Sequence, residues 1–135
     1  MKATLYNDCD VKISLNPAAR TDGTVNGTGV DRHSDAQAYR SAMVVIHAGA
    51  VTDGTHTFEV QDSADNSTFA AVAAAYLQGT EPALGSTDDN EVHVIGYTGS
   101  QRYLRVVCVT TGATSGGICS AVIVLGGGRR KVPRS

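Results

Sequence analysis

The sequence predicts an all-β protein, a single antiparallel β-sandwich or jelly-roll-like barrel of about seven to eight strands. Short apolar runs with a two-residue period recur along the chain, and turn-forming residues separate them. Residues that favour strands and turns are abundant, with 16 Val, 14 Thr and 15 Gly, whereas Trp is absent. A chain of 135 residues is long enough for one domain with its own core. We therefore expect one β domain over residues 1–128 and a flexible basic C-terminal tail over residues 129–135.

The first expected strand covers residues 11–15, where Val11, Ile13 and Leu15 alternate with polar residues. No apolar periodicity follows between residues 16 and 35, a segment rich in Gly, Asn and Asp. We expect this segment to be a long surface loop. Loops longer than about 12–15 residues in a small domain usually serve a function or are disordered. The loop is therefore a candidate interaction element.

We expect the centre of the core in the middle of the chain. Residues 39–46 form a near-continuous apolar run, which is typical of a strand buried on both sides. Asp53 and Gly54 predict a tight turn, because both tolerate a positive φ, and residues 55–61 then alternate as a strand. Residues 69–77 fit the spacing of an amphipathic helix, but nine residues are too few for a stable one. We expect a strand through about Val72 and then a short helical turn.

Three further strands complete the expected domain. Residues 92–95 and 103–109 alternate between two faces, and residues 118–125 are apolar on both faces. The three glycines at 126–128 then predict a flexible hinge. Short strands separated by turns at this spacing are typical of a sandwich or barrel.

The charges divide unevenly at Gly128. The net charge of −2 consists of a body with 7 basic and 13 acidic residues, 7 − 13 = −6, and a tail with four basic residues. An acidic body argues against a general nucleic-acid binder, because such proteins present a basic face to the phosphate backbone. Three interpretations of the tail stay open: a solvated tail, an arm that docks on an acidic patch of a partner or neighbouring subunit, or a non-specific contact to DNA or RNA.

No set of side chains predicts an active site. The four histidines are scattered along the chain, and no serine lies in a G-x-S-x-G turn. The acidic groups at 62–66 and 88–90 lack the spacing of a calcium loop, so we interpret them as turns in which Asp and Asn bond the nearby backbone. No glycine-rich phosphate loop is present. We predict that the protein is not an enzyme and needs no metal or cofactor.

The three cysteines form no C-x-x-C motif and no cluster with histidine at metal-ligand spacing. Cys108 and Cys119 lie in apolar strands, and whether they pair stays open. The N-terminal residues do not resemble a secretory signal, and no apolar run of about 18 residues offers a membrane span. We expect a protein made in the cytoplasm without a membrane partner.

Three stretches resemble a known family. They are SAMVVIHAGAVTDGTHTFEVQDSADNSTFAAVAAAYLQGT, then GYTGSQRYLRVVCVTTGATSGG, then AVIVLGGGRRKVP, and together they span about residues 39–133. This part of the chain resembles the capsid cement or decoration proteins of tailed bacteriophages, which are encoded beside the major capsid protein. The resemblance implies a jelly-roll-like domain on the outer surface of the virion. It also implies two partners, the phage major capsid protein and the protein itself as a homodimer or homotrimer, with no specific nucleic acid.

A cement protein needs a rigid body, symmetric self-contacts and arms that reach neighbouring subunits. We expect the arms to be the loop 16–35, the N-terminal residues and the tail. Charge and expected exposure select six candidate contact residues: Arg20, Arg32, Arg129, Arg130, Lys131 and Arg134.

Two alternatives belong to other classes. A carbohydrate-binding β-sandwich ranks second, because such sites stack sugar rings on aromatic residues and the chain has no Trp and only five Tyr. A small trimeric β-barrel nucleotide hydrolase ranks third. The C-terminal arm of those enzymes carries an aromatic residue that covers the base, and residues 126–135 contain none.

Overall fold

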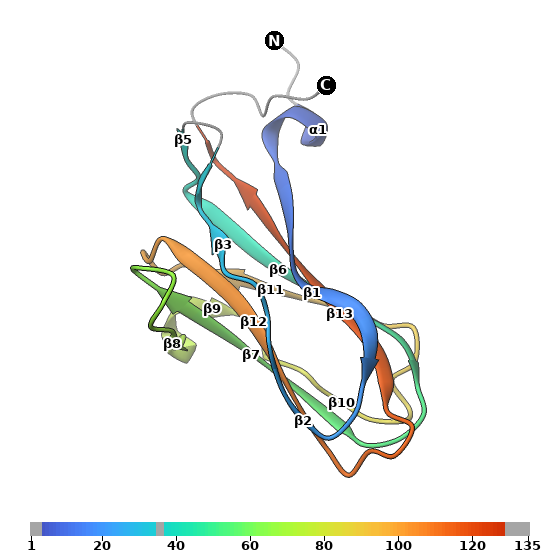
Figure 1. Ribbon diagram of the computed structural model, residues 1–135. Coiled ribbons are helices and arrows are strands. Elements are labelled where there is room, and N and C mark those ends of the chain that lie inside the picture. Colours follow the sequence, from blue (N-terminus) through green and yellow to red (C-terminus); the bar gives the residue numbers. More distant parts are fainter. Residues whose placement is uncertain (1–3, 35–36, 129–135) are drawn as a thin grey trace.

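A computed structural model describes residues 4–34 and 37–128, which fold into two antiparallel sheets packed face to face (Figure 1). The first sheet has the order β1 (Asp10–Arg20), β13 (Gly117–Gly126), β6 (Ser41–Val51), β11 (Val92–Tyr97) and β9 (Leu77–Gln78). The second sheet has the order β10 (Ala83–Leu84), β7 (Thr55–Ser63), β12 (Tyr103–Thr111) and β2 (Gly23–Asn26), with β3 (Val30–Asp31) on β12 and β8 (Ala70–Ala71) on β7. The smaller elements are the hairpin of β4 (His33–Ser34) and β5 (Gln37–Ala38), the helix α1 (Leu5–Asp8) and the 3₁₀ turn η1 (Ala74–Tyr76).

The all-β sandwich is confirmed, and the two sheets do not close into a barrel. The core lies between the sheets, where alternate residues of each long strand point inward. Val44, Ile46, Leu104, Val106 and Ile123 are all fully buried. The strand β6 lies in the middle of its sheet, as the apolar run at 39–46 predicts for the centre of the core.

The prediction of two buried faces is wrong for β6, and the neighbouring strand β13, which is apolar on both faces, also has only one of them buried. Burial alternates along both strands, so that Met43, Val45, Val122 and Val124 point away from the core. The physical reason is that the sandwich has two layers, and no element among the described residues covers the outer side of the first sheet.

The prediction of a long loop at 16–35 is also wrong. The strand β1 continues to Arg20 after a register shift that begins at Ile13, and β2 and β3 both pair with β12. These strands are held by backbone hydrogen bonds, and Val25 and Val30 are the hydrophobic residues that they contribute to the core. A segment with so few inward-facing apolar side chains leaves no periodic pattern in the sequence.

Close backbone contacts join the two sheets where Gly27 and Thr28 lie between β1 and β12. The N–H of Gly27 donates to the carbonyl oxygen of Val106 at 2.8 Å, and the N–H of Thr28 donates to that of Ser14 at 2.7 Å. The buried hydroxyl of Ser14 donates to the carbonyl oxygen of Thr28 at 3.0 Å and accepts the N–H of Val106 at 2.9 Å. Ser14 on the first sheet is therefore bonded directly to the central strand of the second.

The turns behave as the sequence predicts. The carboxylate of Asp65 accepts the N–H groups of Ser67 at 3.0 Å and Thr68 at 2.9 Å, and these bonds hold the pKa of Asp65 below its usual value. Asp88 likewise accepts the nearby N–H of Gly85 at 2.7 Å. Asp89 differs from the prediction, because it accepts the N–H of Val51, a distant residue, at 2.8 Å. The segment 69–77 forms β8, the single 3₁₀ turn η1 and the start of β9, in agreement with a short strand followed by a helical turn.

Asp53 joins the β6–β7 turn to the β12–β13 turn by hydrogen bonds. We expect this contact to weaken in acid. Its carboxylate accepts the N–H groups of Gly116 at 2.7 Å, Thr114 at 3.1 Å and Ser115 at 3.3 Å, and these bonds lower its pKa. A carboxylate with a lowered pKa stabilises the fold above its unfolded pKa of about 3.9, and the stabilisation disappears as the pH falls through the folded pKa. We therefore expect Asp53→Asn to lower the melting temperature by a few degrees at pH 7 and by less at pH 3. Thermal unfolding of both proteins at both pH values measures this, and an equal loss at the two pH values would contradict it.

Candidate functional site

The sequence predicts Arg20 and Arg32 as exposed contact residues. In the structure both side chains are buried. The guanidinium of Arg32 donates to the carbonyl oxygens of Gln101 at 2.6 Å, Arg40 at 3.1 Å and Tyr39 at 3.2 Å. The guanidinium of Arg20 donates to the carbonyl oxygen of Asn16 and to the thiol of Cys119. The exposure assumed for these two residues is wrong, since each side chain is turned inward to bond groups of its own chain. The other four candidates, Arg129, Arg130, Lys131 and Arg134, lie outside the described residues.

The candidate interaction site is the outer side of the first sheet, which we call the apolar sheet face. Strand pairing places its side chains in neighbouring rows across β1, β13, β6 and β11. Ile13, Val92 and Val94 are 54%, 58% and 51% exposed. The face consists of Val11, Ile13, Met43, Val45, Val92, Val94, Val122 and Val124.

No charged side chain interrupts this face among the described residues. The first row reads Val11, Val124, Met43 and Gly96, and the second reads Ile13, Val122, Val45 and Val94. The third row contains the face's polar members, Ser120 and His47, beside Val92. Eight apolar side chains in three adjacent rows form one continuous water-exposed surface.

The outer side of the second sheet is different. It presents Thr57, Glu59 and Gln61 of β7 beside Arg105 of β12. The guanidinium of Arg105 donates to the side-chain oxygen of Gln61 at 2.7 and 2.9 Å and lies 4.1 Å from the centre of the Phe69 ring. One outer face is thus polar with internally bonded side chains, whereas the other is apolar.

The helix α1 extends the apolar sheet face at one end (Figure 1). The hydroxyl of Thr4 caps this helix by accepting the N–H of Asn7 at 3.4 Å. The exposed side chains of Leu5 and Tyr6 line a groove of about 390 Å³ together with Cys9, Val11, Met43 and Val124. This groove, like the face, has no charged residue in its lining.

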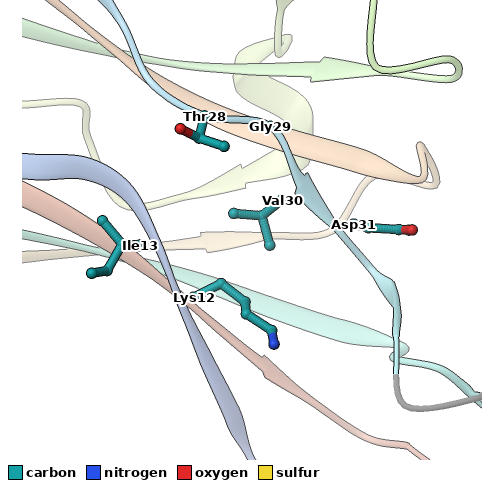
Figure 2. A pocket seen from close by; sticks show the side chains of 6 residues that line it. All are labelled: Lys12, Ile13, Thr28, Gly29, Val30 and Asp31. Atoms are coloured by element: carbon teal, nitrogen blue, oxygen red, sulfur yellow. The ribbon is translucent and has the colours of Figure 1, made fainter.

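A pocket of about 340 Å³ lies on the opposite side of β1, between β1 and β3 (Figure 2). Its charged residues already have partners. Lys12 lies 3.2 Å from the carboxylate of Asp10, and Asp31 accepts two hydrogen bonds of 2.8 Å from Arg102, which lower the pKa of Asp31. Figure 2 shows Val30 between Lys12 and Asp31, so the two charged groups do not face each other across the pocket.

A smaller, polar pocket of about 260 Å³ lies beside the exposed ring of Tyr76. Asp62 in its lining accepts the hydroxyl of Tyr97 at 2.8 Å. Burial, and then this hydrogen bond, raise the pKa of Tyr97 to about 12, so the hydroxyl stays protonated and keeps donating. An exposed aromatic ring next to polar groups has the chemistry of a sugar subsite, and carbohydrate binding stays a prediction.

The structure brings Cys108 of β12 and Cys119 of β13 together between the sheets. Both residues are buried, neither is in a disulfide, and their thiols share a hydrogen bond. This bond, from Cys119 to Cys108, lowers the pKa of Cys108 and raises the pKa of Cys119. Burial keeps both thiols from solvent, so they pack as part of the core.

No three His, Cys, Asp or Glu side chains in residues 4–34 and 37–128 gather closely enough to hold a metal ion. No helix in that part of the chain is long and apolar enough to cross a membrane.

No protein-family model matches the chain, and no curated protein sequence matches it. Among solved structures, it is similar to the crystal structure of PBSX exported protein XepA, with a TM-score of 0.59 and 18% sequence identity. The two proteins share a fold. The similarity covers 100% of this chain and 42% of XepA, so the chain spans less than half the length of that protein.

Proposed function

We propose that the protein is a non-enzymatic structural protein of a phage particle, which binds the outer surface of the capsid and holds neighbouring major capsid subunits together. Two similarities support a phage origin. Residues 39–133 resemble capsid cement proteins, and the sandwich has the fold of XepA, an exported protein of phage PBSX. The proposed location is the virion.

The observation that favours binding over catalysis is the apolar sheet face. The face is about as large as the largest apolar patch on a typical soluble monomer, and such patches are often contact sites for another molecule. The pocket between β1 and β3 and the pocket beside Tyr76, by contrast, hold charged groups that are already bonded within the chain. A rigid body with a large contact surface is suited to a protein that works by assembly.

The basic tail is the proposed contact to the capsid. Its four positive charges follow directly on Gly128 at the end of β13, whereas the body carries a net charge of −6. Such an arm is suited to an acidic patch on a capsid subunit. Each contact needs only modest affinity, because repetition over a symmetric lattice raises the overall affinity by roughly 10²–10⁴.

We expect the purified protein to co-sediment with phage capsids that lack it and to raise the temperature at which these capsids break open. A chain that ends at Gly128 should co-sediment several-fold less well at low salt, because it lacks the tail's charges. Capsids already saturated with the protein serve as the control and should take up no more.

Absence of binding to the unoccupied capsids would overturn the proposal. Equal binding by the full chain and by the chain ending at Gly128 would show that the tail is not the contact to the capsid. Glycan binding by the purified protein would instead favour the carbohydrate interpretation, and turnover of a nucleotide would favour an enzyme.

A further inference from the structure

The apolar sheet face has the composition of a buried surface, although no element among the described residues covers it. Its side chains are of the same kinds as those on the inner side of the same strands, where they form the core. Leaving such side chains in water is unfavourable by about 25 cal/mol for each Å². A partner with an equally flat and uncharged surface would remove this cost.

We propose that a second copy of this chain covers the face, with the first sheets of the two copies packed against each other. Sheets that pack face to face lie about 10 Å apart with their strands within about 30° of each other. The proposed dimer is therefore a four-layer stack, in which the second sheet of each copy is an outer layer. This inference does not depend on the proposed attachment to a capsid.

The size of the face agrees with this partner. Four strands about 4.8 Å apart and about six residues long, the extent of the three rows, cover roughly 400 Å². The groove beside Leu5 and Tyr6 continues this surface at one end. The rows alone amount to about half of the roughly 800 Å² that each partner buries in a typical stable interface, and the groove adds to them.

The arrangement of the face is also suited to twofold symmetry. The middle strands β13 and β6 carry Val122, Val124, Met43 and Val45, and they are flanked by β1 on one side and β11 on the other. A twofold axis parallel to the strands, between β13 and β6, places β13 of one copy over β6 of the other and β1 over β11. The first two rows then meet apolar side chains, whereas the third row places Ser120 of one copy over His47 of the other.

A lipid surface is the other occupant to consider, and charge disfavours it. Membrane-binding faces usually carry Lys and Arg around an apolar centre, because the headgroups of many membranes are anionic. The rows of the apolar sheet face hold no basic residue, and the body as a whole is acidic.

Sedimentation velocity of the full chain between about 1 and 100 µM tests the proposal. We expect a mass twice 14.0 kDa at the upper concentration. Val94→Asp should raise the dimer dissociation constant about 100-fold or more, because the interface would bury an unpaired carboxylate in each copy. Val109→Asp is the matched control, since Val109 is an exposed valine on the outer side of the second sheet, and it should leave the constant unchanged.

A wild-type chain that stays monomeric over this range would overturn the proposal, and so would equal weakening by the two variants. A monomer that floats with vesicles of neutral or anionic phospholipid would assign the face to membranes instead. Thermal unfolding by circular dichroism checks that the variants fold. If Val94→Asp does not fold, Val11→Asp on the edge strand β1 tests the same face.

Discussion

Replacing Gly27 by alanine is expected to lower the free energy of unfolding by about 3 kcal/mol. An added Cβ would lie 2.5 Å from the hydroxyl of Ser14 and 2.8 Å from its carbonyl oxygen, and it would also clash with the carbonyl oxygen of Val106. Two of these atoms are backbone atoms from strands in different sheets, so neither is free to move alone. Relieving the clash would break the bonds that join β1 to β12 at this point.

Gly85→Ala provides the matched control. A Cβ at Gly85 has its nearest neighbour, the carboxylate of Asp88, at 3.9 Å, and the glycine does not have a positive φ. This variant should stay within about 0.5 kcal/mol of the wild type. Urea unfolding of the three proteins measures the difference, and coinciding midpoints for the two variants would show that the close approach at Gly27 does not matter.

Arg32→Met should also lower the free energy of unfolding by about 3 kcal/mol. Methionine fills much of the space of the arginine stem but has no donor for the three carbonyl oxygens that the guanidinium binds. These oxygens belong to two separate segments, residues 39–40 and residue 101, so the loss also loosens the contact between the segments. The variant also loses the cation–π contact between the guanidinium and the ring of Tyr97, whose centre lies 5.3 Å from the guanidinium carbon.

Arg102→Met tests whether burial causes the effect. Arg102 is about half exposed and pairs with Asp31 on the surface, where solvent screens the attraction. This variant should therefore unfold close to the wild-type urea concentration. If it lost as much stability as Arg32→Met, the effect would come from the charge and not from the buried carbonyl contacts. Arg32→Lys should fall between the two, because one ammonium cannot reproduce the planar guanidinium fork.

The strands that the sequence predicts correctly have one face in the core and one in water. The alternation at 55–61 and at 92–95 exists because the sandwich itself alternates inside and outside along each strand. The turns at Asp65 and Asp88 are predictable for a related reason, since a short acidic side chain bonds the adjacent backbone without help from distant residues.

The strands between residues 16 and 34 could not be predicted in this way. Their pairing depends on backbone groups of β12, about eighty residues away in the sequence, and on the irregular register of β1. The inward orientation of Arg32 has the same origin, because one of its partners, Gln101, is distant in the sequence. A guanidinium becomes buried when folding brings several unpaired carbonyl oxygens around it, and composition does not report that.

The apolar runs that form the apolar sheet face are visible in the sequence, where they are interpreted as strands of the core. The runs at 39–46 and 118–125 are apolar on both faces of their strands, and the structure buries one face of each strand within the chain. Hydrophobicity alone does not distinguish a face covered by the same chain from a face covered by another molecule. The runs therefore indicate where the apolar sheet face lies but not which molecule covers it.

The chain enters and leaves the sandwich at the same end, since Asp10 at the start of β1 pairs with Leu125 near the end of β13. The β6–β7 and β12–β13 turns lie at the other end (Figure 1). A body with this geometry can be joined to additional domains, or carry a fused label, without strain on the distant turns. The same fold occupies less than half of XepA. Fusions at Gly128 should therefore leave the turns at the far end of the sandwich unchanged.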